Sequence, residues 1–337
     1  MKKKVLYIER HPSEGISIER VFRQVTKCLS EKKFITEFDQ VPFRTNFSGI
    51  IKNILYYKAK KADIYHITGH IHFITLLLPK KKTILTIHDT GILNIRTGLR
   101  RYILKKILFE IPIRRTKYIT AISEQTKKDL IKYTNCSKDK IRVIENPLNE
   151  EFNVSEDKKF NSAYPQILQI GTSYNKNLNN LIKSLRGLDC FLKIIGRLNS
   201  EQKELLNYHN IKFDNVENIS DQELVECYKK SDIVTFCSTF EGFGLPIIEA
   251  QSMRTPVITS NQSPMKEVAG DGAYFVDPHS VDSIKKGFME LIKNEQLRKT
   301  LITNGLKNVK RFNAERIAAK YEKIYEEIIS SSLSKLT

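Results

Sequence analysis

Residues 233–250 read IVTFCSTFEGFGLPIIEA and hold the clearest local pattern in the chain. The apolar run Ile233–Cys237 predicts a short buried strand. Gly242 and Gly244 then predict a tight turn, and Pro246 is typical of the first turn of a helix, where its missing N–H would have no partner. A strand, a glycine turn and a free helix N-terminus favour an anion site, because unpaired N–H groups and the helix dipole point toward the ligand.

Two carboxylates flank this turn. Glu241 lies on the loop, and Glu249 lies about one turn inside the helix. A carboxylate cannot hold an anion, so each must hold a group that offers hydrogen-bond donors, and sugar hydroxyls are the obvious candidates. Glu249 shares an apolar helix face with Leu245 and Ile248 and has no lysine three or four residues away. A bound ribose would supply the partners that it needs.

Alternating strand-like and helix-like patterns predict two doubly wound, Rossmann-like α/β domains that face each other across a cleft. The length of 337 residues suits two cores better than one. We expect domains at 1–150 and 164–312, a polar linker at 151–163, and a final helix at 313–337 that packs back on the first domain. The predicted strands are Val5–Ile8, Phe34–Phe38, Asp63–Ile67, Thr83–Ile87, Tyr118–Ala121, Ile141–Ile144, Gln166–Ile170, Phe191–Ile195, Ile211–Phe213, Ile233–Cys237, Pro256–Thr259 and Ala273–Val276.

The net charge of +18 is unevenly distributed. Residues 1–150 carry 31 Lys and Arg against 14 Asp and Glu, whereas the remainder carries 25 against 24. A nucleic acid, an anionic membrane surface or an acidic substrate would each suit so basic a half, and a general enrichment in lysine is the alternative. The stretch Arg96–Lys117 interleaves basic and apolar residues, which is typical of a helix in a membrane interface or of a domain helix with its apolar face in the core.

Composition indicates a reduced, intracellular protein. The basic N-terminus runs directly into the strand Val5–Ile8 and is interpreted as a first strand instead of a signal peptide. The five cysteines are scattered without metal-ligand spacing, so we expect free thiols and no metal. We expect a cytoplasmic protein.

Several strand ends carry polar residues that suit a ligand. Gly171 lets the chain leave the strand Gln166–Ile170 tightly, and Lys176 then begins the next helix, where it can neutralise a diphosphate or simply face solvent. His88 ends the strand Thr83–Ile87 and can bond a sugar hydroxyl or steady developing charge. The residues His66 and His70 lie at another strand end, and each of the three histidines has a structural role as its alternative.

These residues occur within an ordered set of motifs that resembles the retaining GT-B glycosyltransferases of family 4. The similarity spans nearly the whole chain and is densest from Pro165 to Pro278. The matching segments are Thr86–Asp89, Ile122–Glu124, Ile144–Pro147, Gly171 with Lys176 and Asn177, Glu241–Ala250 and Ser260–Gly270.

The resemblance implies an enzyme that needs no metal or other cofactor and binds a nucleotide-diphosphate sugar in its C-terminal domain. By the same resemblance, Glu249 binds the ribose, and the catalytic residues are Glu241, beside the transferred sugar, and His88, from the N-terminal domain. The other donor-binding positions are Gly171, Thr172, Lys176 and the backbone amides of Phe243, Gly244 and Leu245, and the acceptor-side positions are Gly15, His66 and His70.

Two positions depart from the family pattern. Thr172 stands where an arginine usually shares the diphosphate with the lysine, so either another basic residue such as Arg197 compensates or donor affinity is modest. Arg254 stands where glycine is customary, and we expect a changed turn there without a change in chemistry.

The function expected from these features is transfer of a hexose to a glycan or lipid-linked glycan during surface polysaccharide assembly, at the inner face of the cytoplasmic membrane. The basic N-terminal half would hold the acceptor and contact anionic lipid. Two other functions were weighed. A nucleotide-sugar epimerase would need a different arrangement of acids and histidines, and a nucleic-acid-binding protein would need a binding module that the sequence lacks, so we expect no nucleic-acid partner.

Overall fold

A computed structural model describes residues 2–15, 17–152 and 158–333 of the chain and divides it into two units. The first unit comprises Met1–Pro147 and Asn313–Thr337, and the second comprises Leu148–Phe312. The polar stretch predicted as a linker at 151–163 therefore belongs to the second unit, and its residues 153–157 lie outside the described part.

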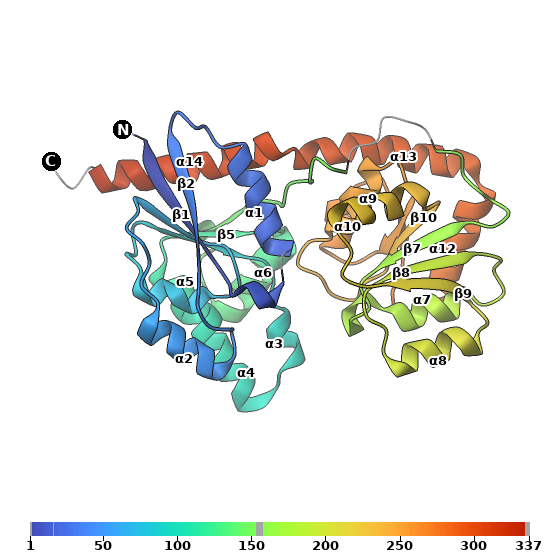
Figure 1. Cartoon of the computed structure of the whole chain (residues 1–337), viewed down its shortest axis with the longest axis horizontal. Helices are drawn as coiled ribbons and strands as arrows, with labels where there is room; N and C mark the ends of the chain where they lie inside the picture. The colour runs from blue at the N-terminus through green and yellow to red at the C-terminus, as the bar shows by residue number, and fades with distance from the viewer. Residues whose placement is uncertain (1, 16, 153–157, 334–337) are drawn as a thin grey trace. The chain divides into compact units, whose positions relative to one another are not determined.

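The first unit is built on a parallel sheet of six strands in the order β2-β1-β3-β4-β5-β6 (Figure 1). Its order reverses between β1 and β3, because the chain passes from β1 first to one side of the sheet and then to the other. The strands are β1 (Lys3–Glu9), β2 (Phe34–Gln40), β3 (Ile64–Ile67), β4 (Thr83–Ile87), β5 (Tyr118–Ala121) and β6 (Ile141–Val143). The helices are α1 (Ser17–Lys27), α2 (Phe47–Tyr56), α3 (Gly91–Ile95), α4 (Gly98–Lys105), α5 (Ile111–Arg115), α6 (Glu124–Thr134) and α14 (Ala314–Leu333), with 3-10 turns at Pro12–Glu14, His72–Leu77 and Lys138–Lys140.

A buried polar chain joins α14 to the middle of this sheet. The hydroxyl of Tyr325 lies 2.8 Å from the Tyr7 hydroxyl and 2.7 Å from His66 Nδ1. The other ring nitrogen of His66 lies 2.7 Å from Thr86 Oγ1, which lies 2.7 Å from Thr120 Oγ1. All five side chains are fully buried, so each polar atom depends on the next for its hydrogen bond. The last helix is thus part of the first unit's core.

The segment predicted as one basic helix at Arg96–Lys117 is helical from Gly98 to Arg115. It begins with α4, continues through a π-helical turn at Lys106–Glu110 and ends in α5. The later part packs into the core through Leu108, Phe109 and Ile113, whereas α4 exposes Leu99, Tyr102 and Ile103. In the described part of the chain, no helix has both the length and the hydropathy that a membrane crossing needs.

The second unit is built on a second parallel sheet of six strands in the order β12-β11-β10-β7-β8-β9. Its order reverses between β7 and β10, so the loops that follow these two strands flank the crevice where open α/β sheets bind ligands. The strands are β7 (Gln166–Ile170), β8 (Phe191–Ile195), β9 (Lys212–Val216), β10 (Ile233–Phe236), β11 (Val257–Ser260) and β12 (Tyr274–Val276). The helices are α7 (Leu178–Ser184), α8 (Ser200–Tyr208), α9 (Asp221–Lys230), α10 (Leu245–Ser252), α11 (Met265–Ala269), α12 (Val281–Lys293) and α13 (Glu295–Val309), with 3-10 turns at Tyr174–Lys176 and Lys310–Phe312.

Candidate functional site

The loops after β7 and β10 bring Lys176 and Glu241 together. Lys176 Nζ lies 2.7 Å from Glu241 Oε1, and both side chains are mostly but not fully buried, with 20% and 14% of their areas exposed. Gly171 makes the close approach possible, because its φ is +87° and a Cβ there would lie 2.9 Å from Lys176 Cγ. The ammonium also lies 4.5 Å from the centre of the Phe236 ring. A cation and a carboxylate therefore meet at the point where the strand order reverses.

Asn175 and Asn177 hold the two loops against each other. Asn175 Nδ2 donates to Glu241 Oε1 at 3.1 Å and to the Phe240 carbonyl at 3.0 Å. Asn177 adopts φ +60° and donates to the Cys237 carbonyl at 3.0 Å. Asparagine tolerates this left-handed backbone better than most residues, which suits it to this turn. The two loops are thus joined by side chains, and the ion pair is held in a fixed frame.

The glycine turn leads into α10 as the sequence predicts. Gly244 has φ +121°, a value that L side chains rarely adopt, and a Cβ there would lie 3.0 Å from Ile247 Cδ1. Gly244 is the N-cap of α10, and among the described residues no side chain caps this helix start. Leu245 is half-buried, and Phe243 is buried with its ring centre 5.6 Å from that of Phe312. The first amides of α10 are therefore suited to an anionic ligand.

Glu249 has a partner that the sequence analysis did not identify. The hydroxyl of Tyr228 in α9 donates to Glu249 Oε2 at 2.6 Å. Tyr228 is fully buried, and burial together with the charge of Glu249 raises its pKa well above the usual value. The expectation that Glu249 needs a hydrogen-bond donor is thus met in part by the protein.

Tyr228 is itself held by the segment through which the chain enters the second unit. The Phe152 ring packs edge-on against the tyrosine ring, with centres 5.4 Å apart. The ammonium of Lys158 bonds the Tyr228 carbonyl and donates to Thr255 Oγ1 at 2.6 Å. Burial lowers the pKa of Lys158 to about 8. No local sequence signal connects these residues, because the contacts arise only from packing.

Thr172 joins the loop after β7 to the loop after β8. Its hydroxyl donates to the Arg197 carbonyl at 2.6 Å, and Gln202 Nε2 donates to the Thr172 carbonyl at 2.8 Å. Gly196 has φ +126°, and a Cβ there would lie 3.2 Å from the Thr172 methyl. Thr172 thus has a structural role at this position, and Arg197 is exposed beside it.

Arg254 lies in a turn with an unusual backbone conformation. Arg254 has φ +53°, which is the left-handed conformation that glycine adopts freely. The arginine thus adopts a conformation that is unusual for a residue with a side chain.

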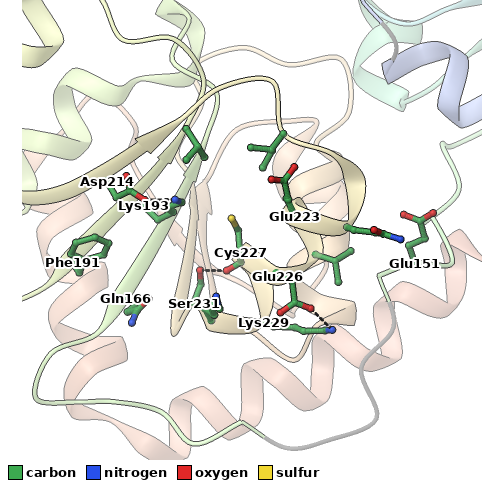
Figure 2. Close-up of a pocket in the computed structure, with 15 residues that line it drawn as sticks. Glu151, Gln166, Phe191, Lys193, Asp214, Glu223, Glu226, Cys227, Lys229 and Ser231 are labelled. Carbon is green, nitrogen blue, oxygen red and sulfur yellow. Dashed lines mark hydrogen bonds and ion pairs between the residues drawn. The ribbon is translucent and has the colours of Figure 1, made fainter.

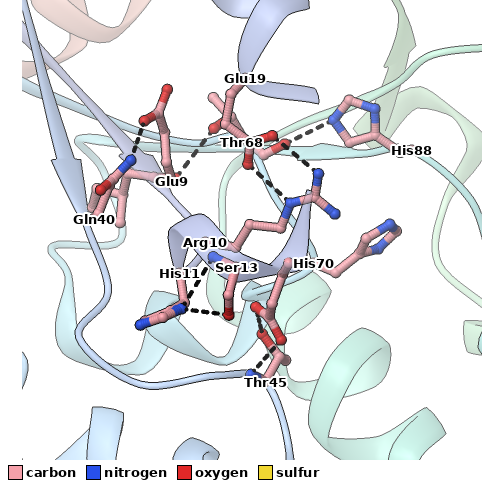
Figure 3. Close-up of polar contacts among 12 residues, drawn as sticks. Glu9, Arg10, His11, Ser13, Glu19, Gln40, Thr45, Thr68, His70 and His88 are labelled. Carbon is pink, nitrogen blue, oxygen red and sulfur yellow. Dashed lines mark hydrogen bonds and ion pairs between the residues drawn. The ribbon is translucent and has the colours of Figure 1, made fainter. Parts of the chain in front are cut away.

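His88 and His70 lie at the carboxyl edge of the first sheet (Figure 3). His88 is buried, and its Nε2 lies 2.7 Å from the Thr68 carbonyl. A carbonyl only accepts, so Nε2 carries the proton and Nδ1 is the acceptor. Burial, with smaller effects from His70, His72 and Arg10, lowers the pKa of His88 well below its usual value. His70 is partly exposed, and its Nε2 lies 3.6 Å from Asp89 Oδ2.

Arg10 organises the surroundings of these histidines (Figure 3). Its guanidinium binds Glu19 through two hydrogen bonds of 2.9 and 3.0 Å. A Cβ on Gly69 would lie 3.3 Å from the Arg10 side chain, and one on Gly15, where φ is +106°, would lie 3.5 Å from it. Gly15 and Gly69, the residue before His70, are thus brought to the same arginine, where the order of the first sheet reverses. The sequence analysis missed Arg10 because it follows a strand without any flanking motif.

His66, which the sequence analysis predicted on the acceptor side, lies apart from this group. It is fully buried beneath α14, and both of its ring nitrogens have partners inside the core. Burial lowers its pKa to about 3, so it is neutral at physiological pH. Its position next to a strand end resembles that of His88, but its role is structural.

A separate groove of about 860 Å³ lies between α9 and the strands β8 and β9 (Figure 2). Lys193 and Asp214 form an ion pair on its floor, and Phe191 and Cys227 are among its other lining residues. The residues that line it include none of the predicted site positions. In the part of the chain that the structure describes, no group of three or more His, Cys, Asp or Glu side chains is arranged to hold a metal ion.

Comparisons with known proteins give a consistent result. Residues 151–308 match the family model described as glycosyl transferases group 1, and residues 24–152 match the model described as glycosyltransferase family 4. The chain is 30% identical over 232 residues to the O-antigen chain mannosyltransferase RfbU of Salmonella typhimurium, a match that covers 66% of this chain and 63% of RfbU. It is 23% identical to the capsular polysaccharide biosynthesis glycosyltransferase CapM of Staphylococcus aureus, over 99% of this chain and 93% of CapM.

The fold also matches solved structures. The crystal structure of Anabaena HepE in complex with UDP and glucose superposes with a TM-score of 0.77 at 13% identity and covers 96% of this chain and 100% of HepE. At that identity the superposition shows the fold alone. The two six-stranded parallel sheets, each covered by helices, are those of the GT-B class.

Proposed function

The chain belongs to the family 4 glycosyltransferases of the GT-B fold, and from this premise we propose that it transfers a hexose from a nucleotide-diphosphate sugar to a glycan or lipid-linked glycan, with retention of anomeric configuration. The observation that carries the proposal is the contact of 2.7 Å between Lys176 and Glu241 at the reversal point of the second sheet. A cation and an uncapped helix start can bind the diphosphate of a sugar donor, and a neighbouring carboxylate can bind the hydroxyl groups of its sugar.

The donor would lie across the carboxyl ends of β7 and β10. Lys176 and the first amides of α10 would face the diphosphate, because both attract negative charge. Glu249 would accept hydrogen bonds from the ribose hydroxyls while Tyr228 holds its other oxygen. Glu241 would face the hexose once the diphosphate has drawn Lys176 toward it. HepE has been crystallised with UDP-glucose on the same fold, which supports placing a nucleotide sugar in this class of structure.

The proposed reaction breaks the bond between the sugar C1 and the diphosphate oxygen. The acceptor hydroxyl attacks C1 from the same face, and its proton passes to the departing diphosphate oxygen. The products are a nucleoside diphosphate and the extended glycan, and the configuration at C1 is retained. Lys176 and the α10 amides would stabilise the charge that develops on the leaving group, so we expect no requirement for a metal ion.

The acceptor would bind at the carboxyl edge of the first sheet. His88 offers an unprotonated Nδ1 there, and His70 is partly exposed beside it. RfbU is named for O-antigen chains and CapM for capsular polysaccharide, and these names support a glycan acceptor in surface polysaccharide assembly. A lipid-linked acceptor would bring the enzyme to the cytoplasmic face of the membrane as a peripheral protein.

A binding screen followed by a transfer assay tests the proposal. Thermal unfolding is measured with UDP, GDP and their hexose conjugates, including GDP-mannose and UDP-glucose. A true donor at about 100 times its Kd stabilises the fold by about 2.7 kcal/mol. Glu249→Ala should lose that stabilisation, whereas Glu204→Ala, an exposed residue in α8, should keep it. Transfer should continue in EDTA, and NMR of the product should show the donor's anomeric configuration. An inverted product, or equal stabilisation of the Glu249 variant, contradicts the proposal.

A further inference from the structure

Exposed apolar side chains are concentrated in one part of the first unit. Of the fifteen large apolar side chains that are exposed among the described residues, ten lie between residues 47 and 103. They occur on α2, on the 3-10 turn at His72–Leu77, on α3 and on α4. Single apolar side chains are common on protein surfaces, but a cluster of exposed apolar side chains indicates a site that contacts another molecule. The concentration of these residues in so short a stretch therefore indicates a contact site.

Helix α2 carries an apolar stripe on its outer side. Phe47, Ile51 and Leu55 recur every four residues, and Phe47 is 76% exposed. The residues that α2 buries, Ile50 and Asn53, lie on a different face. The exposed stripe is therefore additional to the face by which the helix packs.

Helix α4 carries a second stripe of the same kind. Leu99, Tyr102 and Ile103 follow the spacing of one helix face, and Leu99 is 73% exposed. No residue of α4 is fully buried. Leu104 is partly buried against the core, but the other apolar side chains of α4 lie in water, which indicates that this stripe contacts a surface outside its own domain.

The two stripes belong to one connected region. Helix α2 contacts the 3-10 turn at His72–Leu77, which carries the exposed Leu76 and Leu77. That turn contacts the π-helical turn Lys106–Glu110, which continues directly from α4. Figure 1 shows α2, α3 and α4 at the same end of the first unit. We call this region, built from residues 47–56, 72–77 and 91–106, the α2–α4 surface.

The same stretch of chain is strongly basic. Residues 41–109 hold 13 Lys and Arg against 2 Asp and Glu. Arg96, Arg100 and Lys106 border the α4 stripe and are exposed, and Lys52 and Lys58 lie on or next to α2. Apolar stripes bordered by cations match a bilayer interface with anionic head groups, in which apolar side chains enter the acyl boundary and cations remain at the phosphates.

We infer that the α2–α4 surface docks on an anionic lipid bilayer. This inference rests on the proposed function in one respect, since a lipid-linked acceptor would be presented at that bilayer. A nucleic acid would use the cations but would leave the exposed leucine and isoleucine side chains without a role. Helix α2 follows β2 and α3 follows β4, so both begin at the carboxyl edge of the sheet, where His70 and His88 lie. Docking there would place the acceptor-side histidines next to the lipid surface.

Vesicle co-sedimentation of the full chain tests the inference. The probes are vesicles of phosphatidylcholine alone and of equal parts phosphatidylcholine and phosphatidylglycerol. One variant, Arg96→Glu with Arg100→Glu, reverses the charge of two cations on the surface. A second variant, Leu99→Ser with Tyr102→Ser and Ile103→Ser, removes the apolar stripe of α4. Matched controls in the second unit are Lys286→Glu with Lys307→Glu, which reverses two exposed lysines, and Tyr208→Ser, which removes a tyrosine that is 78% exposed.

The expected result is binding to the anionic vesicles that falls at least about tenfold in either surface variant and stays within about twofold in both controls. Added salt should weaken the wild-type binding because it screens the cations. Equal binding by variants and wild type overturns the inference, as does equal binding to neutral vesicles. A dimer in light scattering that the α4 variants convert to a monomer, without any vesicle binding, assigns the surface to a second copy and also overturns it.

Donor-induced thermal stabilisation, measured on the same variants, separates this inference from the proposed function. If the surface variants lose vesicle binding and keep the donor response, both proposals stand. If no nucleotide sugar stabilises the protein while vesicle binding still depends on the α2–α4 surface, the proposed function fails and the inference survives.

Discussion

The carboxyl edges of the two sheets use similar topology to build different environments. At each edge, the polar residues lie near the point where the strand order reverses, which is between β1 and β3 in the first unit and between β7 and β10 in the second. The second unit presents a charged pair, Lys176 and Glu241, whose side chains stay partly exposed. The first unit also has an ion pair at its edge, between Arg10 and Glu19, and in addition it buries neutral histidines there, of which His88 is only 5% exposed.

The difference shows two ways in which polar side chains can be buried at a sheet edge without a large desolvation penalty. Two opposite charges that share a hydrogen-bonded frame offset part of each other's desolvation. An isolated imidazole in a core avoids that cost by staying neutral. The Lys176–Glu241 pair therefore suits a charged ligand such as a diphosphate, and the neutral histidines of the first edge suit hydroxyl groups. The predictions below test this contrast, beginning with the largest expected effect.

Acid should destabilise the first unit well before the second. Burial lowers the pKa of His66 and of His72 to about 3, and that of His88 well below its usual value. The unfolded chain protonates these groups near pH 6.5 while the folded chain does not, so stability is complete above pH 6.5 and is lost as the pH falls toward 3. Each histidine contributes a loss of about 1.4 kcal/mol per pH unit in that window.

Hydrogen exchange between pH 6.5 and 4.5 would measure this, because it reports the two units separately. Glu9 and Asp129 act in the opposite direction, since burial raises the pKa of each, but they are two groups against three. The histidines of the second unit, His209 and His279, are not buried. His66→Gln should reduce the pH dependence of the first unit's unfolding free energy by the contribution of one histidine. Equal slopes in both units would contradict the contrast.

The charged pair of the second unit should dominate catalysis. Lys176→Met removes the cation proposed for the leaving diphosphate, and Glu241→Gln removes the proposed sugar-facing carboxylate. We expect either change to lower kcat by about 10²–10³, the usual cost of losing one preorganised electrostatic contact. Initial rates at saturating donor measure the effect. Lys183→Met is the matched control, because Lys183 lies on the exposed side of α7, and its activity should stay near that of the wild type.

The two edges also differ in how much of them the sequence predicts. The motif of the second edge is nearly contiguous, so the turn at Gly244, the start of α10 and both glutamates could be predicted from residues 233–250. The first edge is assembled from strand ends that are far apart in the chain. His66 and His88 have the same local pattern, and only the tertiary fold distinguishes them, because the partner of His66 is Tyr325 from α14.

Burial explains which strands could be predicted accurately. The interior strands β4, β5 and β7 have the predicted bounds. A parallel strand that is covered on both faces consists mostly of apolar residues, so its ends can be recognised in the sequence. The edge strand β9 runs from Lys212 to Val216, three residues beyond the predicted end, since its polar residues hide the pattern. The pairing of Tyr228 with Glu249 could not be predicted for a related reason: a hydrogen bond across 21 residues depends on where the fold places α9 and α10.

Tyr228 should act as a positioning residue for the donor. Tyr228→Phe removes only the hydroxyl that donates to Glu249 Oε2. A hydrogen bond to a charged group contributes about 1.5–3 kcal/mol, so we expect the donor KM to rise about tenfold to a hundredfold while kcat changes little. Steady-state kinetics with the donor varied would measure both constants. Tyr208→Phe, on the surface of the same unit, should change neither. A fall in kcat at constant KM would instead mean that Tyr228 acts in the chemical step.

The smallest expected effect comes from the hydroxyl of Thr172. It donates to the Arg197 carbonyl at 2.6 Å and so fixes the loops after β7 and β8 without contributing charge. Thr172→Val keeps the shape and loses this bond, which should cost about 0.5–1.5 kcal/mol of unfolding free energy and raise the donor Kd by less than about tenfold. Denaturant unfolding and calorimetric titration measure the two quantities. Thr172→Ser keeps the hydroxyl and should behave like the wild type. If the serine variant binds donor as weakly as the valine variant, the methyl group against Gly196 matters more than the hydrogen bond.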